Sequence, residues 1–289
     1  MPVGSGDYQY EVIADWTQLP AGWSLGWIPS VAVDSQDRVY VYSRSDHPMI
    51  VFDRSGQFVT TWGEDILKDA HGIYIDADDN VYCTERNTHC VHKFDSEGRL
   101  KWTLGSPGIP RPPGVPFNMP TDMAIAPDGC FYISDGYGNS KVHKYSPEGV
   151  LLFSWGEPGD GPGQFDLVHS VWVDRDYNVY ICDRENNRIQ IFDGDGNFQR
   201  QWPGFLRPDK LWFDADETIY MAEVGHRVSI LNRDGEVISQ WGEAGDQPHQ
   251  FRSFPHGIWG DSQGDLYVSE VGSDGRRAAC PDRRCIRSR

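Results

Sequence analysis

The chain has 289 residues and a net charge of −17, and hydrophobic residues make up 38% of it, enough for a sizeable core. The acidic charge argues against a nucleic-acid partner, which needs a basic face, and no apolar run of about 18 residues is present to span a membrane. Residues 1–10 lack the basic and apolar regions of a signal peptide. We therefore expect a cytoplasmic protein, a monomer, that binds neither nucleic acid nor membrane.

The first predicted strand, YEVIADW at residues 10–16, precedes six copies of one pattern. Each copy alternates apolar and polar residues over short runs, which is typical of strands. Asp-Gly, Ser-Gly or Glu-Gly separates the third run from the fourth, which is typical of a hairpin. The copies open with the segments IPSVAVD (28–34), AHGIYID (70–76), PTDMAIA (120–126), VHSVWVD (168–174), PDKLWFD (208–214) and PHGIWGD (255–261).

Four strands in a repeat of roughly 40–50 residues predict a propeller blade. The pattern resembles the NHL repeat, and we expect an all-β, six-bladed β-propeller that occupies residues 1–275 as a single domain. Because the sixth copy lacks an outer strand, the strand at 10–16 is expected to pair into it and close the ring. Residues 276–289 (RRAACPDRRCIRSR) form an atypical basic C-terminal tail.

The second residue of each opening segment defines a strand-start position, and histidine occupies it in alternate copies. The six residues are Pro29, His71, Thr121, His169, Asp209 and His256. The first strand of each blade lines the central channel, and alternate blades of six lie about 120° apart. His71, His169 and His256 are therefore predicted to meet at one height and bind Zn²⁺ or another divalent metal, with one coordination position free. The remaining histidines share no repeat position and are expected on the surface or in turns: His47, His89, His92, His143, His226 and His249.

A second set of candidate residues follows the second strand of several copies. Arg44, Arg86 and Arg184 each lie fifteen residues after the strand-start position, and Tyr137 lies sixteen after it. These loops are expected on one face, around the mouth of the metal channel. The planar fork of a guanidinium group matches an anion such as a carboxylate.

Three segments carry a resemblance to a known family. PTDMAIAPDGCFYISDGYGNSKVHKYSPEG, WGEPGDGPGQFDLVHSVWVD and DRENNRIQIF resemble peptidyl-α-hydroxyglycine α-amidating lyase, also called peptidylamidoglycolate lyase. The resemblance implies a six-bladed propeller in which three histidines hold zinc, and an enzyme that releases glyoxylate from an α-hydroxyglycine. The family's metal histidines fall on His71, His169 and His256, its active-site tyrosine on Tyr137, and two of its arginines on Arg44 and Arg184. The resemblance therefore implies that Tyr137, Arg44 and Arg184 are catalytic and that the substrate is a small-molecule or peptide-derived carboxylate. Together with Arg86 and Phe254, Arg44 and Arg184 are the expected substrate-binding residues.

The resemblance also implies a structural calcium ion that is bound partly by main-chain carbonyls. The corresponding carbonyls belong to Val31 and Ile73. The family places an aspartate directly after the third histidine, where this chain has Gly257. The family pattern does not predict an arginine at the position of Arg86.

Several functions are compatible with these residues. The first is a zinc-dependent lyase that cleaves the C–N bond of an N-substituted α-hydroxyglycine, or amidoglycolate, to an amide and glyoxylate. The second is another metal-dependent lyase or hydrolase acting on a small carboxylate such as ureidoglycolate, since propellers host many activities. The third is a non-enzymatic NHL interaction module. The alternating histidines favour an enzyme, because an inert channel would not need them.

Overall fold

The computed structural model describes residues 2–112, 114–272 and 284–288. All the regular elements in these ranges are strands, numbered β1 to β27, and they form an all-β propeller fold. Among the described residues, no helix is long and apolar enough to cross a membrane. The strands pack as two compact units, which comprise Met1–Ala70, Ala77–Asp79 and Trp212–Arg289 on the one hand, and His71–Asp76 and Asn80–Leu211 on the other.

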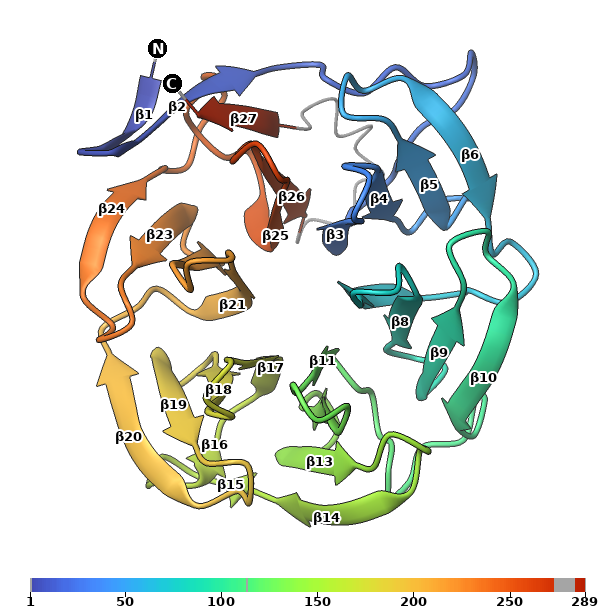
Figure 1. Ribbon diagram of the computed structural model, residues 1–289, viewed down its shortest axis with the longest axis vertical. Coiled ribbons are helices and arrows are strands. Elements are labelled where there is room, and N and C mark those ends of the chain that lie inside the picture. The colour runs from blue at the N-terminus through green and yellow to red at the C-terminus, as the bar shows by residue number, and fades with distance from the viewer. Residues whose placement is uncertain (1, 113, 273–283, 289) are drawn as a thin grey trace. The chain divides into compact units, whose positions relative to one another are not determined.

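The second unit contains three four-stranded antiparallel sheets and a short pair, β15 (Glu157–Pro158) with β16 (Gln164–Phe165). Within this unit β11 and β17 lie side by side, whereas β10, β14 and β20 lie along its outer rim (Figure 1). The strands of the three sheets are β7 (Ala70–Ile75), β8 (Val81–Glu85), β9 (Cys90–Phe94) and β10 (Leu100–Gly105); β11 (Asp122–Ile125), β12 (Phe131–Asp135), β13 (Lys141–Tyr145) and β14 (Leu151–Trp155); and β17 (Val168–Val173), β18 (Val179–Asp183), β19 (Arg188–Phe192) and β20 (Phe198–Pro203).

The first unit contains one regular four-stranded sheet, most of another, and a five-stranded sheet of order β1-β2-β27-β26-β25. Its strand β25 lies beside β3. The boundary between the units falls inside β7 and β21. The strands are β3 (Ser30–Val33), β4 (Val39–Tyr42), β5 (Met49–Phe52) and β6 (Phe58–Trp62); β21 (Pro208–Phe213), β22 (Ile219–Glu223), β23 (Arg227–Leu231) and β24 (Val237–Trp241); and β1 (Pro2–Ser5), β2 (Tyr8–Ile13), β25 (Phe254–Gly260), β26 (Leu266–Val271) and β27 (Arg284–Ser288).

The expectation of six blades is corrected by these sheets, because five of them have the regular four-stranded form. The sixth copy instead forms part of the composite five-stranded sheet. Its N-terminal strand is β2, at Tyr8–Ile13 rather than 10–16, and it pairs with β27, which in turn pairs with β26. Part of the segment expected as a tail is therefore a strand, and residues 276–283 and 289 lie outside the described residues. The pairing of β27 with β26 has a physical reason, because β26 would otherwise expose an unpaired strand edge.

The aspartate that ends the first strand of most copies has a local structural role. In the second copy, Asp76 accepts a hydrogen bond from the Asn80 backbone N–H at 2.9 Å and another from the Tyr82 hydroxyl at 2.9 Å. One carboxylate thus closes the turn and orients a tyrosine of the next strand. The same aspartate–tyrosine hydrogen bond, at 2.9–3.2 Å, recurs in the pairs Asp34–Tyr40, Asp174–Tyr180, Asp214–Tyr220 and Asp261–Tyr267.

Candidate metal and active site

His71 and His169 lie on β7 and β17, and each side chain is almost completely buried. Their ring centroids are 4.9 Å apart, and a ring nitrogen of one lies within 4.8 Å of a ring nitrogen of the other. His71 Nδ1 is 2.6 Å from the Thr121 carbonyl oxygen, and His169 Nδ1 is 2.8 Å from that of Asp209. Because a carbonyl only accepts, each Nδ1 carries the proton, and each Nε2 keeps a lone pair that could bind a metal.

His256 lies on β25 in the first unit and repeats this arrangement. It is buried, and its Nδ1 is 2.6 Å from the Pro29 carbonyl oxygen. Pro29, Thr121 and Asp209 are the strand-start residues of the copies that carry no histidine. Each histidine therefore has its tautomer set by a backbone carbonyl at the same repeat position, which is the usual outer support of a metal-binding histidine.

Tyr137 lies between the two histidines of the second unit. Its hydroxyl oxygen is 3.2 Å from His71 Nε2 and 3.2 Å from His169 Nε2, and both imidazoles meet its ring edge to face. The tyrosine thus contacts the two nitrogens that are free to bind a metal.

Two glycines hold the Tyr137 loop against its neighbours. A Cβ atom at Gly136 would lie 1.9 Å from the Val168 carbonyl oxygen, directly before His169, and one at Gly138 would lie 2.2 Å from the Asn118 side chain. A side chain at position 136 would push the loop away from β17, and one at position 138 would overlap Asn118. The two glycines therefore let the Tyr137 loop pack closely against β17 on one side and Asn118 on the other.

A buried hydrogen-bond network supports the same loop from the other side. Asp135, at the end of β12, accepts hydrogen bonds from the Asn118 backbone N–H at 2.9 Å and from the Asn139 side chain at 2.7 Å. His143 Nε2 lies 3.1 Å from the same carboxylate, and its Nδ1 lies 2.6 Å from the Ser154 hydroxyl oxygen. This network ties the Tyr137 loop to β13 and β14.

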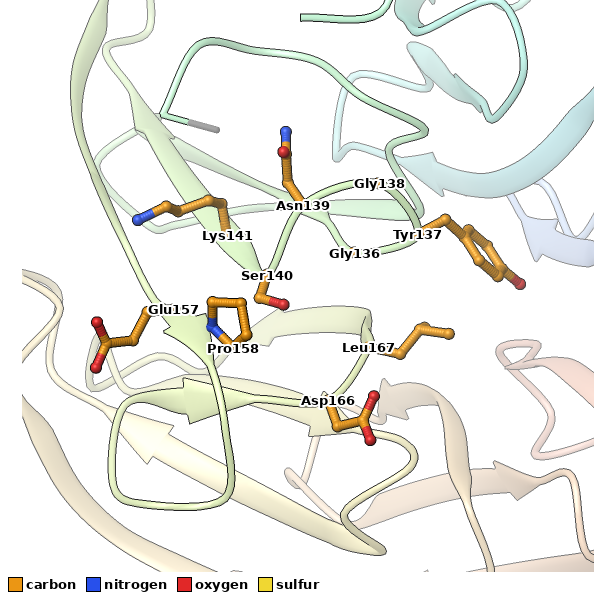
Figure 2. Close-up of a pocket in the computed structure, with 10 residues that line it drawn as sticks. All are labelled: Gly136, Tyr137, Gly138, Asn139, Ser140, Lys141, Glu157, Pro158, Asp166 and Leu167. Carbon is orange, nitrogen blue, oxygen red and sulfur yellow. The ribbon is translucent and has the colours of Figure 1, made fainter. Parts of the chain in front are cut away.

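A cavity of about 370 Å³ lies beside the Tyr137 loop within the second unit. Its polar and charged lining includes Lys141, Glu157 and Asp166. Figure 2 shows the Tyr137 side chain pointing away from Lys141 and Glu157. The phenol hydroxyl is thus directed toward the histidines, while the backbone of the loop borders the cavity.

Two of the predicted arginines contact Tyr137. The Arg184 guanidinium lies 5.7 Å from the centre of the Tyr137 ring and that of Arg86 lies 5.6 Å from it. Arg184 Nη1 also lies 3.5 Å from the Tyr137 hydroxyl. Burial raises the pKa of Tyr137 above its usual value, and the positive charges of Arg184 and Arg86 oppose that rise. Desolvation outweighs the two arginines in this balance, so the phenol keeps its proton more strongly than an exposed tyrosine does.

Asp209 is a site residue for which sequence reasoning assigned no role. Its carboxylate lies 3.1 Å from His169 Nδ1 and 3.4 Å from Arg184 Nη1. Burial raises the pKa of Asp209 to about 7, although Arg184 acts in the opposite direction. Its place at a strand-start position, in register with the histidines, was the signal that could have revealed it.

Arg44 and Phe254 belong to the first unit. Arg44 Nε donates a hydrogen bond to the Ala70 carbonyl at 3.0 Å and lies 3.5 Å from the Asp69 carboxylate. Phe254 packs edge to face on His226, with ring centroids 5.3 Å apart. Both side chains are half-buried, and their assignment to substrate remains a prediction.

Two of the remaining histidines were wrongly expected at the surface or in turns, because His92 and His143 are buried on strands. His89 lies in a turn as expected, although its side chain is buried. His92 and His143 lie on third strands, where each Nδ1 contacts a hydroxyl of the fourth strand. They have a structural reason to be histidine, because an imidazole can link polar groups on both sides within one blade.

Comparison with known proteins gives no matching family model but many relatives. The chain is 34% identical to mouse NHL repeat-containing protein 3 over 271 residues, which cover 84% of the chain and 76% of the relative. It is 31% identical over 228 residues to rat peptidylglycine alpha-amidating monooxygenase, covering 67% of the chain and 23% of the relative.

Two further comparisons concern a named lyase and a solved structure. The chain is 30% identical over 154 residues to a probable peptidyl-alpha-hydroxyglycine alpha-amidating lyase of Caenorhabditis elegans, covering 52% of the chain and 41% of the relative. A streptogramin B lyase structure aligns with a TM-score of 0.68 at 11% identity, covering 97% of the chain and 98% of that structure, which supports the fold alone. The chain therefore belongs to the NHL-repeat family, in which its relatives include peptidyl-α-hydroxyglycine α-amidating lyases.

Proposed function

We propose that the chain is a carbon–nitrogen lyase that cleaves an N-substituted α-hydroxyglycine, either a small molecule or peptide-derived, into an amide and glyoxylate. The observation that carries the proposal is the position of the Tyr137 hydroxyl, 3.2 Å from Nε2 of both His71 and His169. A phenol in this place can exchange a proton with a substrate held beside the histidines. Relatives named as amidating lyases support the same reaction class.

We further propose that His71, His169 and His256 bind one divalent metal, with zinc as the first candidate. All three are buried, and each has its Nδ1 beside a backbone carbonyl, which leaves Nε2 as the ligand atom. The place of His256 in the set is supported by its shared repeat position and its matching carbonyl contact. A bound ion would supply a Lewis acid that makes the substrate hydroxyl more acidic.

The composite five-stranded sheet is proposed to act as the sixth blade. Its strand β25 carries His256 at the strand-start position, as β7 and β17 carry His71 and His169. The blade count and the metal set are thus a single proposal.

The reaction assigns a task to each of the remaining residues. Arg184 and Arg44 bind the substrate carboxylate through their planar guanidinium groups, with Arg86 as an additional positive charge. Tyr137 Oη accepts the proton of the substrate hydroxyl while its own hydroxyl proton passes to the departing nitrogen, so the phenol is neutral before and after the step. The C–N bond pair goes to that nitrogen, which completes the amide, and the hydroxyl oxygen forms the aldehyde carbonyl of glyoxylate.

The proposal is tested with the purified chain. Metal content is measured by mass spectrometry, and glyoxylate release is measured from N-benzoyl-α-hydroxyglycine, with benzamide expected in equal amount. His169→Ala should lose metal and turnover, because it removes one Nε2 ligand, whereas the matched control His249→Ala should retain both. Absence of bound metal together with absence of glyoxylate, unchanged after zinc addition, would exclude the lyase. Full turnover by His169→Ala would exclude the metal from the chemistry.

A further inference from the structure

The second unit contains a buried ammonium group, that of Lys210, which directly follows the strand-start residue Asp209. Lys210 and Asp122 are 3% and 2% exposed. Lys210 Nζ lies 2.7 and 2.6 Å from the two carboxylate oxygens of Asp122 and 3.4 Å from the Ile73 carbonyl oxygen. The Ser170 hydroxyl donates to the same carboxylate at 2.7 Å. The contacts suit an ammonium ion, which has three donors and no acceptor.

These residues belong to one register of the repeat. Asp122, Ser170 and Lys210 directly follow Thr121, His169 and Asp209, and Gly72 directly follows His71. A Cβ atom at Gly72 would lie 2.7 Å from Asp122 Oδ1, so a glycine is needed there to make room for the carboxylate. These residues therefore form a cation-binding site, and the cation that fills it is the Lys210 ammonium group.

This site does not fit the calcium ion that the family resemblance implies. Of the two carbonyls expected to bind calcium, that of Ile73 already faces the Lys210 ammonium. Calcium would have to lie about 2.3–2.6 Å from the same oxygen, and the repulsion between two buried cations so close together is large. These contacts therefore contradict the calcium ion that the family resemblance implied.

The glycine after the third histidine leads to the same conclusion. A Cβ atom at Gly257 would lie 2.8 Å from Ser30 Cα and 3.1 Å from the Pro29 carbonyl oxygen. The backbone thus leaves no room for the aspartate that the family places there. Without that carboxylate, a calcium ion would lack its charged ligand.

We propose that Lys210 is an internal cation that replaces a structural metal ion, so that the fold of this chain is independent of calcium. The Lys210–Asp122 pair links the first strands of two copies that are 88 residues apart in sequence. Removal of one member leaves the other charged and buried, which costs far more than replacement of both by neutral side chains. The proposal does not depend on the lyase function.

The test measures calcium content and thermal unfolding of the full chain with its bound metals. After dialysis against calcium-free buffer, mass spectrometry should find less than about 0.1 calcium per chain, and millimolar CaCl₂ should leave Tm unchanged. Lys210→Met should lower Tm by about 10 °C, and adding Asp122→Asn should restore most of that loss. Lys101→Met is the matched control, because Lys101 pairs with Asp95 but its side chain is 44% exposed, so its loss should change Tm little.

The outcomes are distinguishable from failure of the lyase proposal, since none of them measures turnover. About one calcium per chain after dialysis, or a clear rise in Tm with CaCl₂, would overturn the proposal. So would a Lys210→Met variant as stable as the unsubstituted chain. If Lys210→Met does not fold, the calcium content of the unsubstituted chain and the Tm of the double variant still test whether Lys210 replaces a metal ion.

Discussion

At the scale of single residues, Tyr137 shows how the site depends on neighbouring side chains. Its hydroxyl contacts two imidazole nitrogens and a guanidinium, so the phenol is held in one orientation. The sequence motif places a tyrosine in a loop, but only the packing directs it toward the histidines.

Tyr137→Phe is expected to lower kcat for glyoxylate release by about 10²–10⁴-fold, the usual contribution of one proton-transferring group. The metal content should not change, because His71 and His169 keep their Nε2 atoms. Turnover is measured under saturating substrate, and the bound metal is quantified in the same sample. A normal kcat would remove Tyr137 from the proton transfer.

Arg184→Lys tests carboxylate binding. The substitution keeps a positive charge but loses the planar fork, so KM should rise about tenfold, which corresponds to roughly 1.4 kcal/mol. Arg86→Lys is the matched comparison, since Arg86 contacts the same tyrosine ring but has no counterpart in the family pattern. Steady-state kinetics separate KM from kcat, and an unchanged KM for Arg184→Lys would contradict the assignment.

At the scale of elements, the loop between β12 and β13 is positioned by its contact with β17. Gly136 lies so close to Val168 that an added Cβ would overlap the carbonyl oxygen. The distance between Tyr137 and His169 is therefore set by backbone packing between two sheets of the second unit.

Gly136→Ala should displace this loop and reduce turnover at least tenfold while the histidines retain metal, because a displacement of about 1 Å can cost 10²-fold. Gly194→Ala is the matched control, since a Cβ there would meet its nearest atom at 3.4 Å, an ordinary contact. Both variants are assayed for turnover and bound metal. Equal activity in the two variants would show that the loop does not need this packing.

At the scale of the whole molecule, buried histidines make stability depend on pH. Burial lowers the pKa of His89, whose Nδ1 accepts a hydrogen bond from the Met119 backbone N–H at 2.9 Å. The folded chain thus keeps His89 neutral while the unfolded chain binds a proton below about pH 6.5. The contribution of His89 is complete above that pH and is lost as the pH falls further.

His89→Asn should make Tm less sensitive to pH between 7.5 and 5.5. Asparagine tolerates the positive φ of 59° at this position and can accept the same hydrogen bond without titrating. Thermal unfolding is followed at several pH values for both chains. Parallel curves would mean that other groups account for the acid sensitivity.

The sequence by itself determined the repeat, the strands and the alternation of histidines. The strands are local patterns of apolar and polar residues, and alignment of the copies is enough to show the repeat and the position of the histidines in it. It also predicted that the arginines and Tyr137 occupy equivalent loop positions. Two of those arginines, Arg86 and Arg184, pack on the Tyr137 ring. For the composite sheet, the sequence predicted that an N-terminal strand joins the sixth copy, but it did not predict β27, which lies between that strand and β26.

Only the tertiary structure decided which side chains meet across copies. The carbonyls beside the histidines belong to other copies, and Asp209 reaches both His169 and Arg184 from a separate strand. Lys210 forms an ion pair with Asp122 across a sequence separation of 88 residues, and no local sequence pattern predicts such a pair. Burial decides the rest, since desolvation sets the pKa of Tyr137 and the cost of an unpaired charge, and the sequence alone does not state which groups are buried.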